Sequence, residues 1–180
     1  NEILFGKELE KNLKVCNKCG HHLKLSAAER LEITVDEGSF VETDAELCSV
    51  NPLDFPDYEG KIGKLCSKTG RNDGMVTGRA AINGIPVIIG VADFGFLGGS
   101  MGSVYGEKVT RCFERGVEEK LPVVIVNTSG GARMQEGIVS LMQMAKTSAA
   151  AARFNEAGGL YVAVFTDPTM AGVHASYAML

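Results

Sequence analysis

Several features that place a chain in a membrane or on nucleic acid are missing from this sequence. No apolar run approaches the roughly 18 residues of a membrane-spanning helix. Residues 1–24 are polar with scattered lysines, unlike a secretory signal. The net charge of −4 lacks the basic excess of a nucleic-acid-binding domain. Because 45% of the 180 residues are hydrophobic, we expect a soluble, intracellular globular protein that binds no membrane and no nucleic acid.

A disulfide framework is missing as well. The five cysteines are odd in number, and Cys48, Cys66 and Cys112 are dispersed along the chain, which indicates a reducing compartment. The sequence has no initiator methionine, and its last segment, 173–180, stops within an apolar pattern. We therefore expect a chain that is truncated at both ends.

The common nucleotide-binding motifs are absent too. The dinucleotide fingerprint G-x-G-x-x-G fails after Gly95, because Leu97 and Ser100 stand where glycines are needed. The P-loop pattern fails because Leu65 takes the place of its serine or threonine. Neither a nicotinamide cofactor nor ATP is the predicted ligand.

What the sequence does contain begins with a helix signal. Ser26-Ala-Ala-Glu29 matches a capping box, which predicts a helix over 26–35. The proline-containing stretch 47–58 is typical of an extended connector. We expect three parts: a small polar module at 1–24, a helix and connector at 25–74, and the main domain from 75 to 180.

A hairpin and a repeated strand–loop–helix unit follow. Asn83-Gly84 separates two β-rich runs, 75–82 and 85–94, and supplies the positive φ angles of a type I′ turn. The further strands are expected at 122–126 and 160–165, both buried, and the last helix begins in 173–180. An amphipathic helix is expected before each of these two strands. The expected core residues are Tyr105, Val109, Cys112 or Phe113, and Val117 in the first helix, and Ile138, Leu141, Met142, Ala145, Ala149 and Ala152 in the second. This alternation predicts an α/β fold whose strand-end loops gather on one side.

Glycine-rich loops follow the strands, at 95–102, 127–137 and 166–172. Such a loop before a helix exposes backbone N–H groups, and the helix dipole adds partial positive charge. We expect the amides of Gly130, Gly131 and Gly172 to stabilise developing oxyanions.

The sequence identifies catalytic bases and nucleophiles less clearly. Ser129 does not lie in the nucleophile motif G-x-S-x-G, and pairing it with His174 as a hydrolase is not favoured. Asp167, Glu136 and Glu107 are possible bases, but the spacing singles out none of them. Oxyanion donors without a clear base suit a reaction in which the protein stabilises charge and the substrates move the proton.

The pair Cys16-x-x-Cys19-Gly20 is half of a zinc-ribbon site. His21 and His22 could complete it, but adjacent side chains diverge, so a second cysteine pair before residue 1 is the more plausible source of ligands. A redox role for the cysteine pair is not favoured, because no βαβ pattern surrounds it.

Five motifs in order resemble those of the β subunits of the acetyl-CoA carboxylase carboxyltransferases of bacteria and plastids. The motifs, which run nearly the whole length of the chain, are Cys16-Asn-Lys-Cys-Gly-His-His22, Gly98-Gly-Ser-Met-Gly-Ser103, Ser129-Gly-Gly-Ala-Arg-Met-Gln-Glu136, Ser140-Leu-Met-Gln-Met-Ala-Lys146 and Asp167-Pro-Thr-Met-Ala-Gly-Val-His-Ala-Ser176. The resemblance implies a crotonase-like (ClpP/crotonase) ββα superhelix preceded by a zinc-ribbon module.

The resemblance also implies an activity and its partners. Such a subunit transfers a carboxyl group from carboxybiotin, held on a biotin carboxyl carrier protein, to acetyl-CoA, and the product is malonyl-CoA for fatty-acid synthesis. It works in an α2β2 assembly with a carboxyltransferase α subunit, alongside a biotin carboxylase component. The expected location is the bacterial cytoplasm or the plastid stroma.

The resemblance also implies roles for individual residues of this chain. The expected oxyanion donors are Gly130, Gly131 and Gly172, and zinc would be held by Cys16 and Cys19. The expected substrate contacts are Gly98, Gly99, Ser100, Met101, Gly102, Ser129, Ala132, Arg133 and Val173, with Arg133 as the phosphate or carboxylate partner.

Three departures from the family pattern and two alternative functions remain. The family's first zinc-binding cysteine pair and its C-terminal ββα turns are expected outside this chain, and Ala171 stands where the family usually has a second glycine. One alternative is another crotonase-fold acyl-CoA enzyme, a hydratase, isomerase or decarboxylase. The other is a zinc-ribbon nucleic-acid-binding module.

Overall fold

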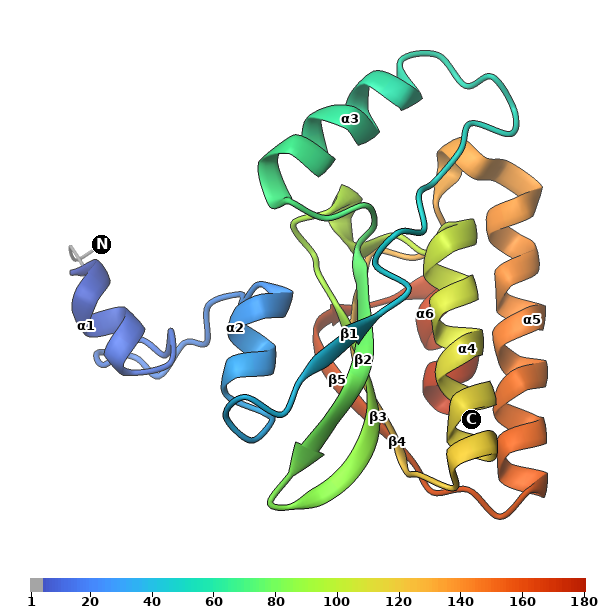
Figure 1. The fold of residues 1–180 in the computed structure, drawn as a ribbon. Coiled ribbons are helices and arrows are strands. Elements are labelled where there is room, and N and C mark those ends of the chain that lie inside the picture. Colours follow the sequence, from blue (N-terminus) through green and yellow to red (C-terminus); the bar gives the residue numbers. More distant parts are fainter. Residues whose placement is uncertain (1–4) are drawn as a thin grey trace.

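A computed structural model describes residues 5–180 and shows an α/β fold built on one mixed sheet (Figure 1). The five strands lie in the order β1-β2-β3-β4-β5. β1, β2 and β3 pair antiparallel, whereas β3, β4 and β5 pair parallel. Their bounds are β1 Val41–Thr43, β2 Met75–Ile82, β3 Ile85–Ala92, β4 Val123–Ser129 and β5 Tyr161–Thr169. The α/β prediction is confirmed, and residues 1–4 of the predicted N-terminal module lie outside the described range.

Helices cover both faces of the sheet (Figure 1). α4 and α5 pack side by side on one face and enclose the larger core, while α2 packs on the other. The helices are α1 Gly6–Lys11, α2 Ala27–Glu32, α3 Tyr58–Thr69, α4 Ser103–Glu119, α5 Gly137–Glu156 and α6 Ala171–His174, with short 3-10 turns η1 Leu97–Gly99, η2 Met134–Glu136 and η3 Tyr177–Met179. Within residues 5–180, no helix is long and apolar enough to span a bilayer.

The two strongest local signals are confirmed. Asn83 and Gly84 join β2 to β3 with φ angles of 50° and 76°, which are those of a type I′ turn. Ser26 caps α2: its hydroxyl accepts the N–H of Glu29, and the Glu29 carboxylate accepts the N–H of Ser26 at 2.8 Å. The helix ends at Glu32, three residues before the predicted end.

The segment between α2 and β2 contains two elements that the sequence did not reveal. β1 pairs with the edge of β2, and α3 begins directly after the predicted connector. α3 carries Gly60 and Gly63 and an N-cap residue, Asp57, with φ of 59°. Because glycine is a poor helix former, propensity alone did not indicate this helix.

The predicted core face of α5 is wrong. Ile138, Leu141 and Met142 are 62%, 51% and 56% exposed. The buried residues are instead Ser140, Gln143, Thr147, Ala150, Ala151 and Phe154. Thr147 is tolerated there because its hydroxyl donates to Gln143 O at 2.8 Å, and Ser140 because its hydroxyl donates to Met101 O at 2.5 Å.

The prediction that the last strand is buried is also wrong. β5 lies at the edge of the sheet, and Leu160, Val162 and Phe165 are exposed by 62%, 41% and 44%. The expected final helix is present as the short α6 followed by η3. The chain therefore presents apolar surface on both α5 and β5.

Two glycine-to-alanine changes should have opposite effects. A Cβ on Gly116 of α4 would lie 2.6 Å from Phe154 and Val123 side-chain atoms, whereas one on Gly63 of α3 would meet nothing within 4 Å. We expect Gly116→Ala to lower the free energy of unfolding by about 1–3 kcal/mol through overpacking. Gly63→Ala should raise it by up to about 1 kcal/mol through helix propensity. Urea denaturation measures both, and equal effects at the two positions would contradict the close packing of α4.

Candidate active site

Three loops meet at the edge where the parallel strands β3, β4 and β5 end. The N–H of Met101, after β3, donates to the carbonyl of Gly131, after β4, at 2.8 Å. The N–H of Met170, after β5, donates to the carbonyl of Ser129 at 2.9 Å. The expected gathering of strand-end loops is thus confirmed.

The amides of Gly130 and Gly131 are engaged within the protein. Gly130 N–H donates to Gly98 O at 2.9 Å, and Gly131 N–H donates to the hydroxyl of Ser129, also at 2.9 Å. A ligand would have to displace these bonds. Oxyanion donation by these two amides therefore stays a prediction, and Ser129 supports the loop through the same bond.

Two neighbouring amides are available instead, those of Ala132 and Gly172. Among the bonds formed by residues 5–180, neither N–H has a protein acceptor. The two lie close together, since a Cβ placed on Gly172 would be 3.4 Å from Ala132 N. Gly172 belongs to the first turn of α6, where N–H groups have no partner within the helix. Two amides from different loops therefore lie together.

Gly131 makes this approach possible. Its φ of 122° and the space around it exclude a side chain: a Cβ there would lie 2.8 Å from the Cβ of Ala171. Ala171 itself has φ of 48°, which is unusual for a residue other than glycine. Val173, the other residue expected to contact substrate in this loop, is fully buried in the core.

Residues 98–102 form a tightly packed wall beside these amides. Gly98 and Gly99 have φ of 64° and 63°. A Cβ on Gly99 would overlap the carbonyl of Thr128, and Met101 is fully buried. Only Gly98 and Ser100 keep partial exposure, so a ligand contact in this loop stays a prediction for those two residues.

Arg133 is not exposed to a ligand. Its side chain is fully buried, and its guanidinium donates to Asp73 Oδ2 at 3.0 Å and to Glu136 Oε1 at 3.1 Å. Burial lowers the pKa of Arg133, but these carboxylates outweigh it and raise the pKa. The carboxylates that Arg133 binds belong to its own chain, so its contact with a substrate phosphate or carboxylate stays a prediction.

The possible bases are held in ion pairs or lie at the surface. Glu136 is buried beside Arg133, and hydrogen bonds from Tyr58 and Ser103 overcome the effect of burial and lower its pKa. A hydrogen bond from Lys146 lowers the pKa of Glu107. Asp167 is exposed at the end of β5.

The Ser129–His174 pair gains no support. Ser129 is fully buried, with its hydroxyl accepting from Gly131. His174 is exposed, and its ring packs edge-on against Phe165 with centroids 5.8 Å apart. Neither side chain has the environment of an activated nucleophile or its base.

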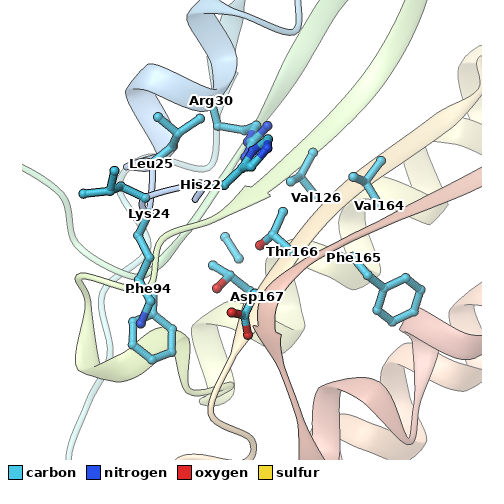
Figure 2. Close-up of a pocket in the computed structure, with 13 residues that line it drawn as sticks. His22, Lys24, Leu25, Arg30, Phe94, Val126, Val164, Phe165, Thr166 and Asp167 are labelled. Atoms are coloured by element: carbon cyan, nitrogen blue, oxygen red, sulfur yellow. The ribbon is translucent and has the colours of Figure 1, made fainter. Parts of the chain in front are cut away.

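A cavity of about 300 Å³ lies beside the strand ends, between them and the segment that leads into α2 (Figure 2). Lys24 and Arg30 come from the helix side, and Val126, Thr166 and Asp167 come from β4 and β5. The Lys24 ammonium lies 3.7 Å from the centroid of the Phe94 ring, a cation–π contact. No sequence pattern indicated this cavity, because its walls come from segments far apart in the chain.

Comparison with known proteins defines the class to which this fold and site belong. A carboxyl transferase domain model matches residues 21–179. The chain belongs to this family. It is 61% identical over 180 residues to the acetyl-coenzyme A carboxylase carboxyl transferase subunit beta of Desulforamulus reducens, and 57% identical over 179 residues to that of a Paenibacillus species. The alignments cover 100% and 99% of this chain and 62% of each relative.

Solved structures agree with this assignment. Transcarboxylase 12S, with methylmalonyl-coenzyme A and methylmalonic acid bound, matches with a TM-score of 0.62 and 35% identity over 72% of this chain and 24% of that one. A Pseudomonas malonate decarboxylase hetero-dimer matches with a TM-score of 0.54 and 26% identity over 73% of this chain and 48% of that one. The α/β architecture is therefore that of carboxyltransferases.

Replacing Ala171 by glycine should stabilise the protein. The positive φ costs an alanine roughly 1–2 kcal/mol, and glycine removes that cost while adding some entropy to the unfolded chain. We expect Ala171→Gly to raise the free energy of unfolding by about 1 kcal/mol. Ala175→Gly, at a neighbouring position with φ of −79°, is the matched control and should lower it. Thermal unfolding of both variants measures the difference, and a destabilised Ala171→Gly would contradict the backbone conformation described here.

Proposed function

We propose that this chain is part of the β subunit of an acetyl-CoA carboxylase carboxyltransferase, which carboxylates acetyl-CoA to malonyl-CoA. The observation that carries the proposal is the pair of unbonded amides of Ala132 and Gly172 at the junction of three strand ends. The identity of 61% to a subunit of that name supports it.

The two amides have a specific task in this proposal. Removing a proton from the methyl group of acetyl-CoA puts negative charge on the thioester oxygen, and two N–H donors aimed at that oxygen stabilise it. Gly130 and Gly131 hold the loop, and Gly172 remains a donor as first expected. Biotin, on its carrier protein, supplies the activated carboxyl group. Since Glu136 and Glu107 are committed to ion pairs, hydratase or isomerase chemistry with a carboxylate base is less well supported.

A partner subunit completes the proposal. The exposed apolar residues Ile138, Leu141 and Met142 lie on one side of α5, which begins at the end of the loop that carries Ala132. An apolar surface of this kind next to a site is typical of an interface. We infer that the carboxyltransferase α subunit docks beside this loop in an α2β2 assembly, with the biotin carboxyl carrier protein and biotin carboxylase as further partners.

The activity can be tested with the full-length subunit and its α partner, by following biotin-dependent decarboxylation of malonyl-CoA. Gly172→Ala places a methyl group 3.4 Å from Ala132 N, so it should lower kcat by about 10²-fold, as loss of an oxyanion donor does. Gly63→Ala, in open space on α3, is the control and should keep full activity. A wild-type complex without biotin-dependent turnover would disprove the proposed function.

We also propose that the protein binds a zinc ion. Gly20 N–H donates to Cys16 O at 2.8 Å, and Gly20 has φ of 69°, so residues 16–20 form a tight turn of the kind that holds two thiolates on a metal. Within residues 5–180, no three possible ligands gather, so Cys16 and Cys19 supply two of the four. We infer that the other two come from outside this range.

Metal content tests this inference directly. In the full-length subunit, we expect about one zinc per chain by elemental analysis, and Cys19→Ser should remove most of it because three ligands bind zinc far more weakly than four. Cys48→Ser, an exposed cysteine elsewhere, is the control. Equal zinc content in both variants would contradict the assignment.

A further inference from the structure

A cluster of charges is buried beneath the proposed site, and the carboxyltransferase chemistry does not use it. We define the Arg133 cluster as Arg133, Asp73, Glu136, Tyr58 and Ser49. The side chains of Arg133, Asp73 and Glu136 are all 0% exposed. Taking such charges out of water is costly, and their mutual attraction repays the cost only with good geometry and further hydrogen bonds.

The cluster supplies those further bonds. One guanidinium nitrogen, Arg133 Nη1, lies 2.9 Å from Ser49 Oγ, 3.2 Å from Tyr58 OH and 3.0 Å from Asp73 Oδ2. The Tyr58 hydroxyl donates to Glu136 Oε1 at 2.6 Å. Burial raises the pKa of Tyr58 to about 12, so this hydroxyl keeps its proton.

The cluster also joins the loops of the proposed site. Arg133 Nη2 donates to Ser100 O at 2.9 Å, in the loop after β3, and Glu136 Oε2 accepts the N–H of Ser103 at the start of α4 at 2.6 Å. Arg133 directly follows Ala132 in the chain, and its own N–H donates to Met101 O at 2.9 Å, so the ion cluster is attached to the main chain one residue beyond the proposed oxyanion donor. A Cβ on Gly102 would overlap both Arg133 and Glu136, so the cluster packs directly against the loop after β3.

From these contacts we infer that Arg133 is a positioning residue: anchored by Asp73, Tyr58 and Ser49, it fixes the direction of the Ala132 amide. The inference rests on the proposed function, because it concerns the same amide. It assigns a task to the segment from the connector to β2, because Ser49, Tyr58 and Asp73 all come from this segment. Arg133 itself touches no substrate.

A purely structural role makes a different prediction. Buried ion pairs can often be replaced by apolar residues of similar size at little cost in stability. A structural Arg133 would therefore affect unfolding and activity together, or neither. A positioning Arg133 would affect kcat in protein that remains folded, since a misplacement of about 1 Å can cost about 10²-fold in rate.

The test compares Arg133→Lys and Tyr58→Phe in the full-length subunit assembled with its α partner, using biotin-dependent decarboxylation of malonyl-CoA. Lysine keeps the charge but cannot reproduce the planar fork of donors, and Tyr58→Phe removes only one bridging hydroxyl. We expect kcat to fall by about 10²-fold and about 10-fold, with KM for malonyl-CoA changed by less than about 3-fold. Tyr105→Phe removes a buried hydroxyl that bonds only to Tyr177 and is the matched control, with kcat unchanged.

A second readout does not depend on activity. Hydrogen exchange should increase in the peptides covering 98–103 and 129–136 of both variants, while strands β2 and β3 keep their protection. If Arg133→Lys does not fold, the test rests on Tyr58→Phe, which is the milder change. Wild-type kcat in folded Tyr58→Phe, or unchanged exchange in both peptides, would overturn the inference. An inactive wild-type complex would instead overturn the proposed function, and the exchange measurement would still test whether the cluster orders the loops.

Discussion

Parallel pairing of β3, β4 and β5 is the constraint on which the site depends. Parallel strands end at the same edge of a sheet, so the loops that follow them must meet there. The main-chain bonds Met101 to Gly131 and Met170 to Ser129 then fix how the loops touch. Without this pairing, the amides of Ala132 and Gly172 would have no reason to lie together, because 40 residues of sequence separate them.

Glycine contributes to this arrangement mainly because it has no side chain. At Gly131 and Gly99 a side chain would collide with the neighbouring loop, and both residues have positive φ. The close approach leaves N–H groups unbonded, but these groups do not belong to Gly131 or Gly99. It brings the adjacent Ala132 amide next to the start of α6, where the first turn leaves its N–H groups unpaired. Gly131 and Gly99, which permit the close approach, are thus not the residues whose amides stay unbonded.

The local parts of the fold could be predicted from the sequence. The hairpin at Asn83-Gly84 and the cap at Ser26 depend on a few adjacent residues, and both are present as predicted. The inward face of α5 could not be predicted, because Thr147 satisfies its hydroxyl within its own helix, which makes a polar residue acceptable in a core.

The site was predictable only in outline. The glycine loops marked the edge of the sheet where the three loops meet, but residue types do not reveal which N–H groups are bonded within the protein, as those of Gly130 and Gly131 are. The burial of Arg133 could not be predicted, because one of its two anionic partners, Asp73, lies 60 residues away in the chain. Long-range pairs of this kind leave no pattern in a single sequence.

The order of the Arg133 cluster along the chain has a consequence for synthesis. Ser49, Tyr58 and Asp73 leave the ribosome before Arg133, which donates hydrogen bonds to all three and neutralises the charge of Asp73. A carboxylate is not buried without its counterion, so the burial of Asp73 requires that residue 133, in the loop after β4, has already been made. The contacts between this loop and the segment before β2 therefore belong to a later stage of synthesis than the β2–β3 hairpin, whose residues all precede Arg133.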